Sequence, residues 1–223
     1  SPAIGVSTLS TLTETNLNGS FIDVSLLNET FVSGQPTVSS FVLNNAPAGV
    51  SISNVSNITS TSATVNLAYD NTDFDNTVNN FSIKALASSL TGGNDLTSGS
   101  LTITAVNESI INSPISLTDV NYVVGNGPST AKFFTISSSN LKTGPSNVSV
   151  ATSSPDFEIS TTSATDGFGD GPLVLPYTIN GAFSSNTIWV RLKAGLALAS
   201  YTSNITITGG GASSSTAVSG SVT

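Results

Sequence analysis

The chain has 223 residues, no cysteine and no histidine, and its formal net charge is −8. Without cysteine it has no disulfide, thiolate zinc site or cysteine nucleophile, and without histidine it lacks the commonest general base, so hydrolytic triads are excluded. Charged residues make up only 8% of the chain, so Ser, Thr and Asn side chains must carry the solvated surface.

The first half alternates short runs of β-branched and aromatic residues with clusters of Gly, Pro and Asn. Such runs are typical of half-buried strands, and the clusters between them reverse the chain. The predicted strands are 21–26, 41–43, 50–52, 63–67, 81–83 and 101–104.

The second half shows the same pattern of short apolar runs separated by turn residues, but its residues do not repeat those of the first half convincingly. This difference favours two different sandwich types. Its predicted strands are 115–117, 132–136, 148–150, 157–159, 173–175, 187–192, 203–207 and 217–219. The chain is about twice as long as one immunoglobulin-size sandwich of roughly 100 residues. The predicted fold is therefore all-β, with two consecutive immunoglobulin-like β-sandwich domains at 1–110 and 111–223, joined near Asn107 to Pro114.

Tyr201 is a more specific indication of the fold in the second half. It precedes the run 203–207. This position resembles the tyrosine corner of immunoglobulin-like sandwiches, whose hydroxyl bonds to upstream backbone. An ordinary half-buried tyrosine is the alternative, and both interpretations keep the sandwich.

Five motifs of the second half occur in the order of a known module: 136–141, 156–160, 190–196, 201–207 and 218–223. They resemble a recurrent immunoglobulin-like module of large secreted and surface proteins of Bacteroidetes-type bacteria. The first half resembles an adhesin repeat along 12–19, 41–49 and 68–75. The resemblance implies modular architecture and a surface location and brings no catalytic residues. Such modules also serve as spacers beside secreted enzymes.

The negative charge is concentrated in the first half. Residues 1–110 hold eight acids and one base, Lys84, or −7, whereas residues 111–223 hold five acids and four bases, or −1. An acidic half with one lysine cannot neutralise a run of phosphates, so nucleic acid is excluded as a partner. Metal cations are better candidate partners for this acidic half.

The loop after the run 63–67 is the sharpest candidate metal site. Asp70, Asn71, Asp73 and Asp75 offer carboxylate and amide oxygens within six positions. Ca²⁺ takes six to eight oxygen ligands, and alternating Asp73 and Asp75 can point the same way. The sequence therefore predicts a candidate calcium site, and Ca²⁺ is the one cofactor we expect.

This loop is not an EF-hand, because Asn76 and Ser82 stand where that motif needs Gly and Glu. Further ligands must come from elsewhere, and Glu14 or Asp95 are candidates. The alternative is an Asx-rich turn whose side chains cap backbone amides while Phe74 plugs the core.

Asp166 and Asp170 form a second, weaker candidate calcium site in a glycine-rich loop. Glycines free backbone carbonyls for coordination. The alternative is an ordinary turn, in which aspartate and glycine are also common.

Trp189 is the only tryptophan and lies out of phase with the inward-facing Ile188 and Val190. Alternation places it beside Arg191 on the outer face of a strand, where an indole next to a cation can stack on a sugar ring. The alternative is packing over the arginine stem or against a neighbouring domain.

One carboxylate pair remains as an enzymatic option. Asp156 and Glu158 share a strand face while Phe157 and Ile159 face the core. Nothing nearby suggests a cleft, so we interpret them as ordinary outward-facing acids and expect no enzyme activity.

The sequence has no export-signal pattern and no apolar run of 18 residues, so we expect signal and anchor in a longer parent chain and no direct membrane insertion. The expected function is a non-catalytic structural or adhesive segment, a stalk or repeat, of a bacterial surface protein located outside the cell. The alternative is a carbohydrate-binding or accessory module of a secreted enzyme. The expected partners are neighbouring domains of the same parent chain and a surface glycan or protein receptor.

Overall fold

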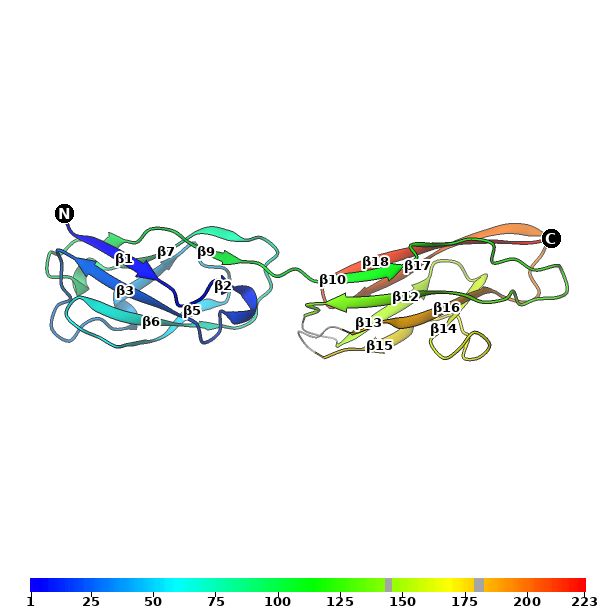
Figure 1. Ribbon diagram of the computed structural model, residues 1–223, viewed down its shortest axis with the longest axis horizontal. Helices are drawn as coiled ribbons and strands as arrows, with labels where there is room; N and C mark the ends of the chain where they lie inside the picture. The colour runs from blue at the N-terminus through cyan, green and yellow to red at the C-terminus, as the bar shows by residue number, and fades with distance from the viewer. Residues whose placement is uncertain (143–145, 179–182) are drawn as a thin grey trace. The chain divides into compact units, whose positions relative to one another are not determined.

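The computed structural model describes residues 1–142, 146–178 and 183–223. The chain divides into two compact units, Ser1–Asn107 and Glu108–Thr223, each with its own hydrophobic core (Figure 1). The sequence placed the boundary after residue 110. The structure places it after Asn107, because β10 (Ser109–Ser113) pairs with β12 (Lys132–Ser139) of the second unit.

The first unit consists of two sheets that face each other. One has the order β1-β3-β6-β5 and the other β2-β9-β7-β4, with β8 paired to β7. The strands are β1 (Ala3–Ser7), β2 (Leu12–Thr13), β3 (Phe21–Leu27), β4 (Phe41–Asn44), β5 (Val50–Ser56), β6 (Ser62–Tyr69), β7 (Val78–Ala85), β8 (Leu96–Thr97) and β9 (Leu101–Thr104). Three short 3₁₀ helices interrupt them at Glu14–Asn16, Val38–Ser40 and Ala87–Ser89.

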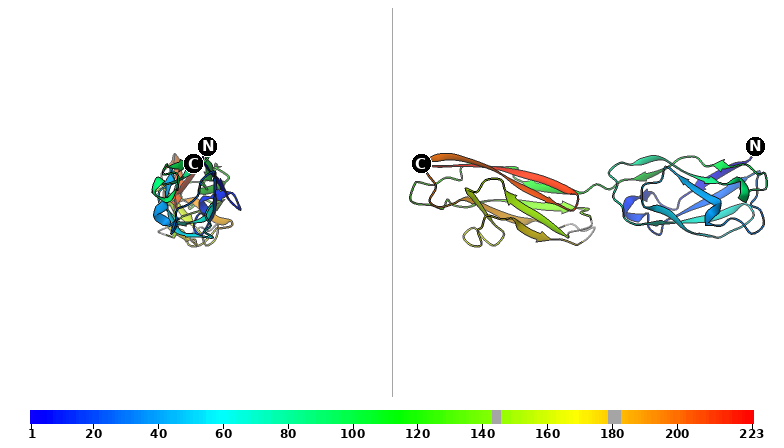
Figure 2. Two further views of the ribbon diagram at one scale, coloured as in Figure 1. Left: turned by 90° about the vertical axis from the view of Figure 1, so that its left-hand side faces the viewer. Right: turned by 180° about the vertical axis from the view of Figure 1, so that it is seen from behind.

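The second unit also has two sheets, of order β10-β12-β16-β14 and β11-β18-β17-β13-β15. Its remaining strands are β11 (Ser116–Leu117), β13 (Asn147–Thr152), β14 (Phe157–Ser160), β15 (Leu173–Pro176), β16 (Asn186–Leu192), β17 (Ala199–Gly209) and β18 (Ala212–Val222). Strands β17 and β18 form a long hairpin, seen from the front in Figure 1 and from behind in Figure 2.

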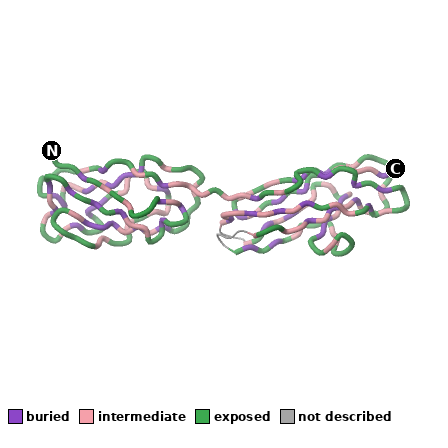
Figure 3. The backbone as a smooth tube through the Cα atoms, viewed as in Figure 1, coloured by how far each residue is buried: buried purple, intermediate pink, exposed green. Residues whose placement is uncertain are grey.

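Alternation along the strands builds both cores, so that buried and outward segments alternate along the backbone (Figure 3). In the first unit Ile22, Val65 and Phe81 are fully buried, and in the second unit Phe134 and Ile188 are. Burial of this apolar surface is the main favourable term in the folding of each unit.

Both units have the immunoglobulin-like strand arrangement. Seven successive strands fall into one sheet of order A-B-E-D and another of order G-F-C, which are β1, β3, β4, β5, β6, β7 and β9 in the first unit and β10, β12, β13, β14, β16, β17 and β18 in the second. The predicted fold class is confirmed. The expectation of two different sandwich types was wrong, because the two units share this strand order, to which the first unit adds β8 beside β7 and the second adds β15 beside β13.

Tyr201 lies near the start of β17, the strand that corresponds to F. Its hydroxyl donates to the backbone carbonyl of Ala197 across 2.8 Å. This is the upstream hydrogen bond of a tyrosine corner, one of the two interpretations of Tyr201 that the sequence left open.

In the part of the chain that the structure describes, no helix has the length and apolar character needed to cross a membrane.

Candidate functional site

The loop between β6 and β7 carries the acidic residues of the first candidate calcium site. Asp70 Oδ1 accepts hydrogen bonds from the Thr72 hydroxyl (2.6 Å) and the Thr72 backbone N–H (2.9 Å). These two bonds, the hydroxyl first, hold the pKa of Asp70 below its ordinary value. Asp70 therefore caps an Asx turn, which is the structural alternative that the sequence left open.

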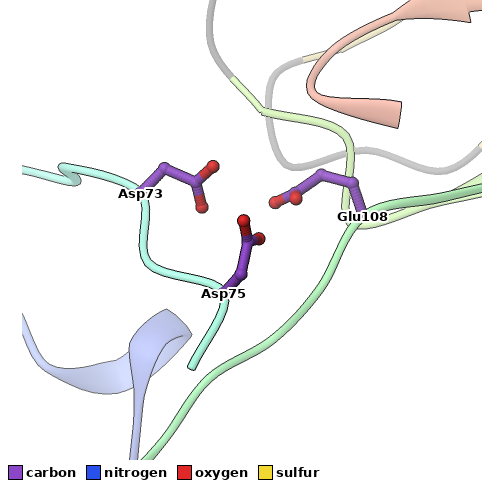
Figure 4. A group of neighbouring side chains, drawn as sticks. All are labelled: Asp73, Asp75 and Glu108. Atoms are coloured by element: carbon purple, nitrogen blue, oxygen red, sulfur yellow. The ribbon is translucent and has the colours of Figure 1, made fainter. Parts of the chain in front are cut away.

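Asp73 and Asp75 are exposed on the same loop, with carboxylate oxygens within 4.8 Å of each other (Figure 4). Asn71 is exposed too and adopts a left-handed backbone conformation with φ of 66°. Of the three predicted acidic ligands, Asp73 and Asp75 therefore lie close together, whereas Asp70 accepts hydrogen bonds within its own turn. Figure 4 also shows Glu108, which belongs to the second unit, where its Oε1 lies 3.1 Å from Lys142 Nζ.

Glu14 contacts the acidic loop through backbone amides. Its carboxylate is buried and accepts from the N–H of Phe74 (3.3 Å) and of Val106 (3.0 Å). Asp95 pairs with Lys84 at 3.2 Å and accepts from the N–H of Ala87 at 2.8 Å. Both of the further ligands that the sequence suggested therefore have structural partners of their own.

Phe74 is half-buried, and its ring packs edge-on against Tyr69 with 6.2 Å between ring centroids. It belongs to the side chains packed against the first core. Phe74 therefore packs against the core, as the Asx-turn alternative expects.

Both aspartates of the glycine-rich loop in the second unit have partners, Asp166 within the loop and Asp170 outside it. Asp166 Oδ2 accepts from the hydroxyls of Ser163 (3.2 Å) and Thr165 (2.8 Å), and Asp170 lies 2.5 Å from Lys193 Nζ. An ammonium at that distance competes with a metal ion for the same oxygen.

Trp189 lies on the outer face of β16, as predicted, and is partly buried. Its cross-strand neighbour on β12 is Phe133, with 4.9 Å between ring centroids. Sequence reasoning missed Phe133, although the signal was present. Because two phenylalanines stand side by side at 133 and 134, alternation must turn one of them outward.

Arg191 is engaged on two sides. Its Nε donates to Glu158 Oε1 at 2.6 Å, and its guanidinium carbon lies 3.9 Å from the centre of the Phe168 ring. Glu158 is therefore the partner of Arg191, whereas Asp156 accepts from the Ser154 hydroxyl at 2.9 Å. The two carboxylates have separate partners, and Phe157 and Ile159 face the core as predicted.

No family model matches this sequence, and no curated protein matches it. Among solved structures, the titin domains Z1Z2 in complex with telethonin share 14% identity over 98% of this chain and 96% of that chain, with a TM-score of 0.33. The C-terminal domain of the Streptococcus pyogenes antigen I/II-family protein AspA shares 7% identity over 99% of both chains, with a TM-score of 0.32. The C-terminal domain of the Streptococcus agalactiae polypeptide BspA shares 8% identity over 100% of both, with a TM-score of 0.30. These similarities concern the fold alone, and TM-scores this low carry no argument about function.

Proposed function

We propose that this chain is a non-catalytic, load-bearing segment, a stalk or repeat, of an extracellular bacterial surface protein. Its partners are then the neighbouring domains of the same parent chain, which pull on its two ends. The observation that supports this role is the pairing of the second strand of each unit with its last strand, β2 with β9 and β11 with β18, which run parallel and are neighbours in one sheet.

In the second unit this pairing is long. The segment 115–124 runs beside 217–223 and forms five backbone hydrogen bonds of 2.9–3.2 Å, which begin with Ala217 N–H to the Ile115 carbonyl and end with Val124 N–H to the Thr223 carbonyl. Asn121 adds a side-chain acceptor for the Ser221 N–H at 2.8 Å. We call this pairing the parallel clamp of the second unit.

Gly220 is the residue of β18 that lets the two segments approach. A Cβ atom at this position would lie 2.0 Å from the carbonyl oxygen of Val120. Any other residue there must push the segments apart. The close pairing thus has a determinant in the sequence.

The first unit has a shorter parallel pairing. Leu12 and Thr13 of β2 lie opposite Ile103 and Thr104 of β9. Glu14, the next residue after β2, extends the contact by accepting from the Val106 N–H.

Parallel neighbours resist tension because of their geometry. The start of one strand and the end of the other lie at opposite ends of the pair, so a pull on the two chain ends slides the strands past each other. All of their hydrogen bonds then bear load together instead of breaking one by one. Forced unfolding follows the rate of unfolding, which interactions of this kind slow.

The test is to stretch the full chain from its ends by single-molecule force spectroscopy. We expect two unfolding events, the stronger of which weakens in Gly220→Ala while the other is unchanged. The matched control is Gly169→Ala, because a Cβ at Gly169 meets no atom within 4 Å. If Gly220→Ala leaves both forces unchanged, or if both units open at the lowest forces measurable, the load-bearing role is wrong.

A further inference from the structure

The outer face of the sheet β10-β12-β16-β14 carries an aromatic pair on its two central strands. Phe133 on β12 lies directly opposite Trp189 on β16, and their ring planes are inclined by 56°. Side chains at such positions share one face of the sheet and point away from the core, where Phe134 and Ile188 lie.

Phe133 is an exception among the phenylalanines of the chain. It is 49% exposed, and it is the only exposed one of the ten phenylalanines, all of which lie in the described part of the chain. The next outward pair on the same two strands is Thr135 with Thr187, so hydroxyl groups border the rings. The surface is therefore apolar at its centre and hydroxylated beside it.

The other side of the pair is bordered by Arg191 and Glu158. Arg191 follows Trp189 by two positions on β16, faces the same way and is held between Glu158 and the ring of Phe168. The pair is partly buried, with side-chain exposures of 20% for Arg191 and 16% for Glu158. The guanidinium and carboxylate charges cancel, so this surface presents fixed polar groups without net charge.

We propose that this aromatic patch, made of Phe133, Trp189, Arg191, Glu158 and Phe168, binds the sugar rings of an uncharged polysaccharide. A pyranose ring has an apolar C–H face that packs on aromatic rings, and its equatorial hydroxyls match the planar donors and acceptors at the border. Binding sites of this kind combine aromatic surface with a few fixed polar groups. A polyanion finds no unpaired cation within the patch, and a polycation finds no unpaired carboxylate.

This inference goes beyond load bearing and gives the proposed surface segment an adhesive activity. The two properties are separable. The parallel clamp lies in the segments 115–124 and 217–223, which include none of the five residues of the patch. A failure of sugar binding leaves the force experiment unaffected, and the reverse also holds.

The test uses the full chain and the emission of Trp189, which is the only tryptophan and therefore reports directly on the patch. The probes are xylan, mixed-linkage β-glucan and galactomannan, with alginate as the anionic comparison. We expect a saturable change of emission with at least one uncharged polysaccharide and none with alginate. Retardation in affinity gel electrophoresis should give the same ranking.

Two variants assign the binding to the patch. Trp189→Ala and Phe133→Ala should each lower the affinity at least about tenfold, as expected for a central aromatic contact. Affinity gel electrophoresis measures both variants, because Trp189→Ala removes the only tryptophan and with it the emission signal. The matched control is Ile111→Ala on β10, which removes a side chain that is 62% exposed from the same sheet. If no uncharged polysaccharide changes the emission of Trp189, or if Phe133→Ala binds as the native chain does, the pair only covers the sheet and the proposal is wrong.

Discussion

The backbone N–H of Val106 donates to Oε2 of Glu14 across 3.0 Å, so the residue that follows β2 holds the chain after β9. The other oxygen, Oε1, accepts from the N–H of Phe74 in the acidic loop. One buried carboxylate thus joins three segments that are far apart in the sequence. These two donors are backbone amides, which need an acceptor when they are removed from water, and the Tyr69 hydroxyl also donates to Oε1 at 3.5 Å.

Glu14→Gln should destabilise the first unit. The carboxamide keeps one acceptor oxygen and turns an N–H₂ group towards the second backbone N–H, which then has no acceptor. We expect the free energy of unfolding to fall by about 1–3 kcal/mol. Hydrogen exchange of peptides from the first unit should speed up, most of all around Val106.

The control for this substitution is Asp75→Asn, which changes an exposed carboxylate on the neighbouring loop. It should alter stability by less than about 0.5 kcal/mol. Equal exchange rates at Val106 in the native chain and in Glu14→Gln would contradict the role given to Glu14.

The strands of this protein could be predicted from its sequence because alternation is a local property. Each predicted run falls within an observed strand, except that β11 begins at Ser116 and not at Ile115. Strands β1, β2, β8 and β10 were missed. Strands β2 and β8 have two residues each, too few for an alternating pattern, whereas β1 and β10 lie at sheet edges and are only partly buried. Strand β10 was taken for the connector because it lies between the run 101–104 and Pro114.

The candidate sites were harder to predict, because residue type and spacing do not show which partner a side chain takes. Asp70 and Asp73 look alike in the sequence, yet Asp70 accepts from the Thr72 hydroxyl while Asp73 lies near Asp75. The sequence placed Arg191 beside Trp189, but it did not show that Arg191 donates to Glu158 and packs over the ring of Phe168. Local spacing does not show which strand pairs with which, and that pairing sets these contacts.

Tyr201→Phe should weaken the second unit without changing its fold. The substitution removes only the hydroxyl that donates to the Ala197 carbonyl. We expect a loss of about 0.5–1.5 kcal/mol, the usual net value of one such hydrogen bond. Urea denaturation followed by Trp189 fluorescence measures it, since the tryptophan belongs to this unit. A lower midpoint with an unchanged slope is expected, and an unchanged midpoint would show that the tyrosine corner adds no stability here.

Acid should destabilise the first unit partly through Glu29. The Thr91 hydroxyl (2.5 Å) and then the Thr30 N–H (2.9 Å) lower the pKa of Glu29, and burial opposes them. Because the folded pKa lies below the unfolded value of about 4.3, the ionised group stabilises fully above that value. This stability is lost as the pH falls through the folded pKa.

Thr91→Val tests this dependence, because it removes the hydroxyl and nearly keeps the volume of the side chain. The folded pKa of Glu29 should then rise towards its ordinary value. The variant is expected to be less stable than the native chain at neutral pH and to lose less stability between neutral pH and mild acid. Urea denaturation at several pH values measures the slope, and parallel curves for the two proteins would rule out this contribution of Glu29.

Calcium should stabilise the first unit through Asp73 and Asp75. Their carboxylates repel each other within 4.8 Å, and a divalent ion between them removes this repulsion and adds oxygen coordination. Asp70 is committed to the Thr72 turn, so backbone carbonyls and water must complete the shell, and we expect weak, millimolar affinity. At a hundredfold excess over Kd, a ligand that binds only the folded state adds about 2.7 kcal/mol.

The measurement is the unfolding of the full chain in Ca²⁺ and in EDTA, with hydrogen exchange used to separate the two units. Asp73→Asn combined with Asp75→Asn keeps the shape of the loop and removes its charge, so the calcium response should disappear. Asp166→Asn in the second unit is the control and should leave that response intact, because Asp166 already accepts from Ser163 and Thr165. If the first unit responds equally with and without the two carboxylates, the ion binds elsewhere and the acidic loop serves only as a turn.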